Sequence, residues 1–220
     1  HHHLFDAWGR LDEAVRTGQA VPGRGDADET LRRESFLMGM FNLAMQLAPK
    51  VAAAVDLAGR RHLLDLGGGP GTYAVHFCLE NPGLRATVFD LPTSRPFAEK
   101  TIARFGLQGR VHFAPGDFHV DPVPQPCDVV WLSHILHAED PAACRRVIAK
   151  AVAALSPGGI VLVHDFFLTD DRTHPLFAAL FSLNMLLATP AGQAYSESEV
   201  RHMLVENGIS GIRRLDLKTP

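Results

Sequence analysis

The first quarter of this 220-residue chain has hydrophobic positions at helical spacing. Apolar residues recurring every three or four positions predict one amphipathic helix over residues 4–17, namely at Leu4, Trp8, Leu11 and Val15. A glycine- and charge-rich connection follows at 18–28, and a second helix is predicted from about 29 to 57. The N-terminal part is therefore expected to be helical.

From residue 61 onwards, short apolar runs alternate with helical stretches. This alternation predicts an α/β fold with a doubly wound, mostly parallel, Rossmann-like sheet and helices on both faces. The predicted strands are 62–66, 85–90, 111–113, 128–133, 160–166 and 209–217. The predicted helices are 72–80, the stretch after Leu91-Pro92 to about 105, 141–155, 175–187 and 196–207.

The predicted first strand runs into a glycine-rich turn, HLLDLGGGPGTY, at residues 62–73. Glycines let the backbone approach a ligand, and the N–H groups at a helix start attract an anion. The dinucleotide fingerprint G-x-G-x-x-G requires a third glycine where Thr72 stands, which disfavours an NAD(P) oxidoreductase. The spacing of Asp65, Gly67, Gly69 and Gly71 instead looks like the first motif of S-adenosylmethionine-dependent methyltransferases, while a bland glycine turn is the weaker alternative.

Two acidic residues follow the next predicted strands. Asp90 comes 19 positions after Gly71, close to the spacing of a carboxylate that binds ribose hydroxyls, although it could simply cap a helix. Asp117 could accept a hydrogen bond from an adenine amino group, with Phe118 and Leu91 against the ring; alternatively it is a turn aspartate.

Two histidines follow the fourth predicted strand, and His164 and Asp165 lie near the end of the fifth. A histidine at such a position suits proton transfer from a hydroxyl, because its ordinary pKa lies near neutrality, and Asp165 could orient the imidazole. A metal site would use His134, His137, His164 and Asp165, but no helical H-x-x-x-H pair is present and we expect no metal. Three histidines are interpreted as structural or surface residues, namely His112, His119 and His134.

Composition narrows the class of protein further. A hydrophobic content of 46% fits one main domain, and a net charge of −3 gives no electrostatic case for nucleic acid. The three cysteines have no C-x-x-C spacing, so we expect reduced thiols and a cytoplasmic protein. No apolar run reaches the length of a membrane span and no signal peptide is evident, so no membrane partner is expected. His1–His3 look like a tag remnant.

Several motifs together resemble the hydroxyindole and caffeate type of O-methyltransferase, a metal-independent class I family. They span about Phe36 to Pro220 and comprise LLDLGGGPG, VFDLP, GDF, ILH, PGG and SLNMLLATPAGQAYSESEV. The resemblance implies S-adenosyl-L-methionine as cofactor and S-adenosyl-L-homocysteine as product. It implies that the cofactor is surrounded by Gly67, Asp90, Leu91, Asp117, Phe118 and the backbone of Ser133.

The same resemblance implies roles in catalysis and acceptor binding. His137 matches the general base, and Asp165 matches one of two acidic residues that flank it. Residues facing the small-molecule acceptor would be Phe41, Met45, Asn184 and Met185. The implied reaction is O-methylation of a small aromatic or polyketide-like molecule of secondary metabolism.

The chain departs from the family pattern at three places. Ala138-Glu139 replaces the Asp-Trp that commonly follows the base, and Ala194 stands where the second acid is expected. The resemblance implies a homodimer, and we expect the given sequence to contain little of the family's dimerisation domain. We expect residues 4–57 to be its remnant plus an acceptor-side helix and residues 58–220 to be the catalytic domain, whose closing β-hairpin would continue beyond Pro220.

Two alternatives share this fold and cofactor. The first is a methyltransferase that acts on carbon or nitrogen, because a base can serve either reaction. The second is a truncated, non-catalytic S-adenosylmethionine-binding domain, which the missing acid and the shortened ends would explain.

Overall fold

The computed structural model describes residues 2–21, 29–215 and 217, without the side chains of 2–4 and 29–33. The chain divides into two compact units. We call Glu29–Ser133, Ala149–Val163 and Gly211–Pro220 the sheet unit, and His1–Asp28, His134–Ile148 and His164–Ser210 the histidine unit. Each is described by itself.

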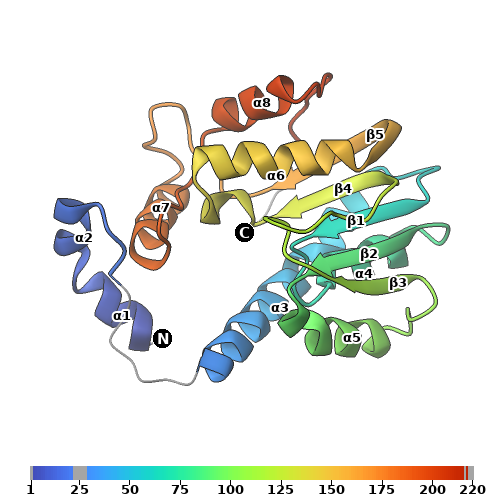
Figure 1. The fold of residues 1–220 in the computed structure, drawn as a ribbon, viewed down its shortest axis with the longest axis horizontal. Helices are drawn as coiled ribbons and strands as arrows, with labels where there is room; N and C mark the ends of the chain where they lie inside the picture. Colours follow the sequence, from blue (N-terminus) through green and yellow to red (C-terminus); the bar gives the residue numbers. More distant parts are fainter. Residues whose placement is uncertain (1, 22–28, 216, 218–220) are drawn as a thin grey trace. The chain divides into compact units, whose positions relative to one another are not determined.

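The sheet unit is built on five strands in the order β3-β2-β1-β4-β5 (Figure 1). β1 pairs in parallel with both β2 and β4, and β2 pairs in parallel with β3. From β1 the chain adds β2 and β3 on one side and β4 and β5 on the other, so the strand order switches direction next to β1. Open α/β sheets bind ligands at such a position. The strands are β1 (His62–Leu66), β2 (Arg85–Asp90), β3 (Val111–Pro115), β4 (Cys127–Ser133) and β5 (Leu155–His164), the last of which belongs to this unit up to Val163.

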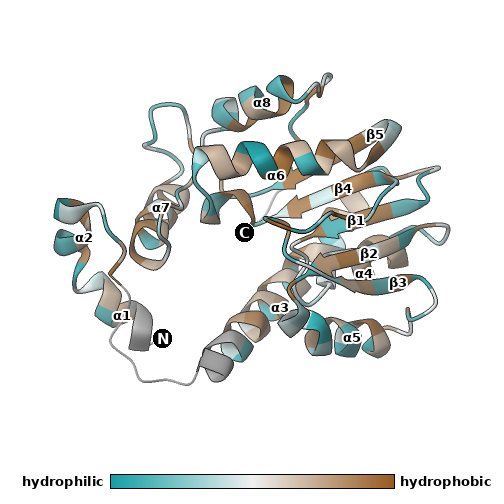
Figure 2. Ribbon diagram, in the orientation of Figure 1, coloured by the Kyte–Doolittle hydropathy of each residue, from teal (hydrophilic) through white to brown (hydrophobic). Residues whose placement is uncertain are grey.

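Three helices of the sheet unit pack together around an apolar core. α3 (Glu29–Ala54) packs against α4 (Thr72–Glu80), and α4 packs against α5 (Arg95–Arg104), which follows the short 3-10 turn η1 (Pro92–Ser94). Figure 2 shows hydrophobic stretches along the strands and the adjoining helices. The core includes the buried side chains of Val51, Leu63, Phe77, Val88, Val129 and Trp131. These contacts confirm the predicted α/β fold.

The histidine unit is helical. It comprises α1 (His2–Trp8), α2 (Leu11–Thr17), the 3-10 turn η2 (Leu136–Ala138), the first part of α6 (Pro141–Ala153), α7 (Leu176–Ala188) and α8 (Glu197–Glu206). Both α1 and α2 contact α7, with Ala7, Ala14, Val21 and Leu187 buried between them. α8 begins with a capping box in which Ser196 and Glu199 bond each other's backbone N–H.

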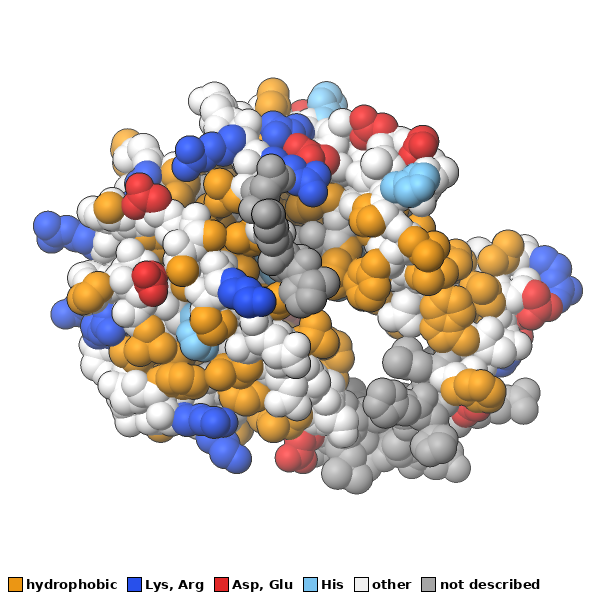
Figure 3. Space-filling model, turned by 180° about the vertical axis from the view of Figure 1, so that it is seen from behind, with side chains coloured by type: hydrophobic (Ala, Val, Ile, Leu, Met, Phe, Trp, Pro, Cys, Tyr) orange, Lys and Arg blue, Asp and Glu red, His pale blue; other side chains and the backbone are white. Residues whose placement is uncertain are grey.

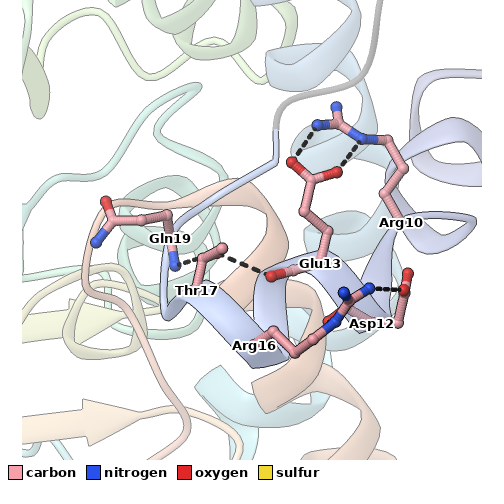
Figure 4. A network of polar contacts seen from close by, with 6 residues as sticks. All are labelled: Arg10, Asp12, Glu13, Arg16, Thr17 and Gln19. Atoms are coloured by element: carbon pink, nitrogen blue, oxygen red, sulfur yellow. Dashed lines mark hydrogen bonds and ion pairs between the residues drawn. The ribbon is translucent and has the colours of Figure 1, made fainter.

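The prediction of one helix over residues 4–17 is wrong, because the backbone leaves the helix between α1 and α2. The break falls at Gly9 and Arg10, where glycine is a poor helix former. Ala14 faces the core, and Val15 is 62% exposed instead. On α2, Arg10 pairs with Glu13 and Arg16 pairs with Asp12, and Thr17 accepts a bond from the Gln19 N–H (Figure 4).

Two strand predictions also need correction. Residues 209–215 and 217 form no strand; Gly208 and Gly211 adopt left-handed backbone near this segment, and it has no ladder partner among the described residues. β5 begins at Leu155 rather than at 160 and ends at His164, because the turn-like residues 156–159 lie within the strand, with Gly158 left-handed (φ 77°) as in a β-bulge. All three cysteines are buried and free, and no described helix is long and apolar enough to cross a membrane.

Candidate active site

The glycine-rich loop connects β1 to α4 in the sheet unit, and two of its glycines cannot be replaced without a collision. Gly71 is left-handed (φ 72°), and a Cβ there would lie 3.0 Å from Cγ2 of Val88. A Cβ on Gly68 would lie 2.5 Å from Cγ of Asp65. The loop therefore packs closely on the strands beneath it and exposes backbone rather than side chains to a ligand.

Asp65 lies in β1 with only 2% of its surface exposed. Burial raises its pKa to about 7, and a hydrogen bond from the backbone of Ala74 opposes this rise. Its Oδ2, like the buried hydroxyl of Thr72, has no hydrogen-bond partner among the described residues. Unpaired buried acceptors are uncommon in folded proteins, so these two atoms mark the loop as a place where a polar ligand would fit.

Asp90, at the end of β2, holds the glycine loop and the following turn together. Its Oδ2 accepts a bond of 2.7 Å from the N–H of Gly69. Its Oδ1 accepts bonds from the N–H of Leu91 at 2.7 Å and from the hydroxyl of Ser94 at 2.8 Å. A carboxylate has about four acceptor positions, so one remains for a ligand hydroxyl. Ser94 was missed because its role depends on this carboxylate rather than on a motif.

Asp117 and Phe118 lie in the loop after β3, where Asp117 forms a turn. Its Oδ1 accepts from the N–H of His119, and its own N–H donates to Oδ2 of Asp121, each at 2.8 Å. The Phe118 carbonyl accepts a bond of 2.7 Å from Nζ of Lys150, which anchors the loop. These contacts agree with the turn interpretation of Asp117 and leave its second oxygen for a ligand.

Ser133 ends β4, the strand next to β1. A side-chain hydrogen bond links it to Tyr73 at the start of α4, whose pKa burial raises to about 12.

The histidine unit brings together His137 from η2 and Asp165, which directly follows β5. Nδ1 of His137 lies 2.6 Å from Oδ1 of Asp165, and the His137 backbone N–H donates to Oδ2 at 3.3 Å. The side chains are 12% and 6% exposed. Burial raises the pKa of Asp165, but the hydrogen bond and charge of His137, together with His134, outweigh it and lower that pKa. The dyad thus combines an ionised carboxylate with an imidazole.

His134 is the site residue that sequence reasoning interpreted differently. Its side chain is only 20% exposed, and its Nδ1 lies 3.9 Å from Oδ1 of Asp165. Its ring contacts that of His164 at 4.8 Å. Burial lowers the pKa of His134 to about 4, so its imidazole is neutral at pH 7. The sequence held a signal for this cluster, because His134 stands three positions before His137. His112 and His119 are exposed, as predicted.

Aromatic side chains surround the dyad. The ring of Phe181 meets that of His137 edge-on at 4.7 Å, and it packs against Phe166 at the same distance. Phe181 lies on α7 with Asn184 and Met185, three and four positions further on, so all three share one side of the helix. Met185 is 8% exposed. Figure 3 shows hydrophobic side chains gathered over α7.

The other two predicted acceptor residues, Phe41 and Met45, lie on α3 in the sheet unit. Both are half-buried, and the Arg104 guanidinium lies 5.9 Å from the centre of the Phe41 ring. In contrast, Phe36 on the same helix is 63% exposed. These side chains of α3 are therefore only partly buried in the core.

Comparison with known proteins identifies relatives along almost the whole chain. A curated 3-hydroxy-5-methyl-1-naphthoate 3-O-methyltransferase from Streptomyces sahachiroi is 38% identical over 97% of this chain and 63% of its own length. The N,N-dimethyltransferase OxyT from Streptomyces rimosus is 32% identical over 94% of this chain and 62% of its own. The crystal structure of human N-acetylserotonin methyltransferase in complex with SAM superposes with a TM-score of 0.83 and 29% identity, covering 95% of this chain and 62% of the human one.

The chain spans just under two thirds of the length of these relatives. The family model described as an O-methyltransferase domain matches residues 8–210, which is most of the sequence. This chain belongs to the O-methyltransferase domain family.

Proposed function

We propose that this protein transfers a methyl group from S-adenosyl-L-methionine to a hydroxyl group of a small aromatic or polyketide-like molecule, with His137 as general base. The observation that carries the proposal is the 2.6 Å contact between Nδ1 of His137 and Oδ1 of Asp165 in a chain of this family. A buried carboxylate on one imidazole nitrogen orients the ring and stabilises the imidazolium.

The contact between His137 and Asp165 supports Nε2 as the basic nitrogen. With the Nδ1 proton donated to Asp165, the lone pair of a neutral ring lies on Nε2. Nε2 then removes the proton of the acceptor hydroxyl, and Asp165 balances the positive charge that forms on His137. Ala194 stands where the resemblance places a second acid, so Asp165 carries this role alone.

The sheet unit has residues that fit the cofactor. Asp65, Gly67, Gly69 and Gly71 would hold its methionine part beside the loop, where Oδ2 of Asp65 has no hydrogen-bond partner among the described residues. The free acceptor position of Asp90 suits the ribose hydroxyls. The adenine would be held by Leu91, Asp117, Phe118 and the backbone of Ser133. Bound S-adenosylmethionine supplies an already activated methyl group, so that positioning provides much of the rate.

The proposed acceptor-binding residues are Phe41, Met45, Asn184 and Met185. Phe41 and Met45 of the sheet unit are apolar, as is Met185 of the histidine unit, and Asn184 offers one amide. Apolar residues with few polar groups suit an aromatic acceptor. We assign residues 4–57 to the dimerisation region and the acceptor side of the protein and residues 58–220 to catalysis. No metal takes part in this scheme.

A second candidate is N-methylation, which the likeness to OxyT favours. The dyad would then deprotonate an ammonium or anilinium group instead of a phenol. A panel of matched phenols and anilines separates the two, because a phenol-specific enzyme leaves the aniline of the same ring unmethylated.

The first experiment is calorimetric titration with S-adenosylmethionine, S-adenosylhomocysteine and NADH in parallel. We expect micromolar binding of both adenosyl ligands and none of NADH; tight NADH binding would overturn the cofactor assignment. The second is His137→Ala, which should abolish methyl transfer and leave adenosyl-ligand affinity nearly unchanged. His112→Ala, which alters an exposed histidine of β3, is the matched control. Full activity of His137→Ala would show that the base is another residue.

A further inference from the structure

His134, His137 and Asp165 form a cluster of three side chains, whereas a base and its orienting acid require only two. One candidate ligand atom from each of the three side chains lies within 4.8 Å of the other two. Nδ1 of His134 and Nδ1 of His137 lie 3.9 Å and 2.6 Å from the same oxygen, Oδ1 of Asp165. Ligand atoms around a tetrahedral Zn²⁺ lie about 3.4 Å apart, so shifts of roughly 1 Å would bring these atoms to coordination distance.

We propose that His134, His137 and Asp165 bind one divalent transition-metal ion of the Zn²⁺ class, and that the bound ion inhibits the protein. Two imidazole nitrogens and one carboxylate oxygen form a ligand set that suits Zn²⁺, Co²⁺ and related ions. The set leaves a further coordination position, which water or an acceptor oxygen would fill.

The carboxylate already has the outer support that metal ligands have. The N–H of Phe166 donates to Oδ1 of Asp165 at 2.8 Å, and the N–H of His137 donates to Oδ2 at 3.3 Å. Such contacts fix the orientation of a ligating group and strengthen metal binding. They hold Asp165 in place whether or not the imidazoles shift.

The backbone of His134 favours the same interpretation. Its φ is 58°, in the left-handed region that few non-glycine residues adopt, and its N–H donates to the carbonyl of His164 at 2.9 Å. Unfavourable backbone conformations of this kind persist where surrounding structure enforces them, often at functional sites. This conformation places the His134 ring beside Asp165, a position that the base mechanism does not need.

The inhibitory half of the proposal rests on the proposed function. A metal ion on His137 and Asp165 would replace the hydrogen bond that joins them and would withdraw electron density from the imidazole. His137 could then neither keep the orientation nor accept a proton as the free ring does. The metal-binding half stands on the cluster alone and is tested without cofactor or acceptor.

The test is titration of the full chain with Zn²⁺ in competition with a chromophoric chelator, together with absorption spectra of the Co²⁺ form. His1–His3 bind such ions themselves, so all proteins carry His1→Ser, His2→Ser and His3→Ser. The variants are His134→Asn and Asp165→Asn. Asparagine tolerates left-handed backbone and is a poor ligand for zinc. His112→Asn removes an exposed histidine on β3 and is the matched control.

We expect one Zn²⁺ per chain and tetrahedral Co²⁺ absorption. Each ligand variant should lose at least the ~10–100-fold in affinity that loss of an outer-shell partner costs, and the control should lose none. Unchanged affinity in His134→Asn would overturn the site, provided that its circular dichroism matches the parent. Activity then tests the second half: if Zn²⁺ binds at the cluster without slowing methyl transfer, the inhibitory role is wrong. If metal binds and no methyl transfer is found at all, the proposed function fails and the site stands.

Discussion

The hydroxyl of Tyr195 donates a hydrogen bond of 2.6 Å to the carbonyl oxygen of Glu139. Tyr195 follows α7, whereas Glu139 ends the turn that carries His137, and both belong to the histidine unit. The bond joins segments 56 residues apart in the chain. It therefore stabilises the turn that carries the proposed base.

Removing this hydrogen bond should loosen the turn without altering the side chains of the proposed dyad. Tyr195→Phe removes the part-buried hydrogen bond to Glu139 together with the hydrogen bonds of the hydroxyl to the side chains of Cys144 and Gln193, and we expect the free energy of unfolding to fall by at least ~0.5–1.5 kcal/mol in urea titration. Methyl transfer should slow while its pH profile stays the same, because His137 and Asp165 are retained. A profile that shifts along the pH axis would mean that Tyr195 affects the base itself.

Asp90 should link the stability of the glycine loop to cofactor affinity. In Asp90→Asn, the amide NH₂ faces one of the backbone N–H groups of Gly69 and Leu91, and two donors cannot form a hydrogen bond. Each charge-assisted bond that is lost in this way is worth ~1.5–3 kcal/mol. We expect S-adenosylmethionine binding to weaken at least tenfold in calorimetry.

The matched control for Asp90→Asn is Asp128→Asn in β4. Oδ2 of Asp128 also accepts two backbone bonds, from Arg61 at 2.7 Å and His62 at 2.9 Å, at the amino ends of the strands. This variant should lose stability but keep cofactor affinity. Equal losses of affinity in both variants would show that the effect of Asp90 is only structural.

A substitution at Gly71 should be costly because of its backbone conformation. Gly71→Ala forces a Cβ into left-handed backbone 3.0 Å from Val88, and we expect a loss of about 1 kcal/mol or more in the free energy of unfolding. Gly83→Ala meets no atom within 4 Å and should change stability little. Thermal denaturation of the two variants side by side measures the difference, and equal melting temperatures would contradict the packing described for the loop.

The buried carboxyl of Asp65 should make the protein less stable as the pH rises. Burial raises its pKa in the folded state to about 7, well above the ~3.9 of an unfolded aspartate. The folded protein therefore holds this proton more tightly than the unfolded chain does. The free energy of unfolding is highest below pH ~3.9 and falls as the pH rises to about 7, because only the unfolded chain loses the proton in this range. The fall is up to ~1.4 kcal/mol per pH unit. Asp65→Asn, which cannot ionise, should lack this component.

Urea titrations at pH 5, 6, 7 and 8 check this prediction without cofactor. The parent should lose stability between pH 5 and 7 relative to Asp65→Asn and follow it more closely above pH 7. Parallel curves for the two proteins across this range would mean that Asp65 ionises with an ordinary pKa.

Much of the sheet unit could be predicted from local sequence. The bounds of β1, α4 and β2 agree with the predicted ones, since each apolar run is bordered by glycine, asparagine or proline residues that end it. α3 ends within a few residues of its predicted end. The loop glycines were identifiable because their spacing is itself the signal.

Other features could not be read from spacing. The break between α1 and α2 lets Ala7 and Ala14 share a buried cluster with Leu187 of α7, a contact that helical periodicity does not contain. The alternation of apolar runs with helical stretches predicted a strand at 209–217, but a strand needs a partner, and pairing is decided by the whole sheet.

By itself, the sequence determined the glycine loop and most strands and helices of the sheet unit, because these depend on residue types and local spacing, and its resemblance to a known family indicated His137 and Asp165 as the candidate dyad. Only the tertiary structure decided that their side chains meet at 2.6 Å, that His134 joins them, and that Asp65 is buried with an unpaired oxygen. The physical reason is that contact and desolvation depend on segments far apart in the chain. His137 and Asp165 are 28 positions apart, and nothing in either segment alone specifies the other.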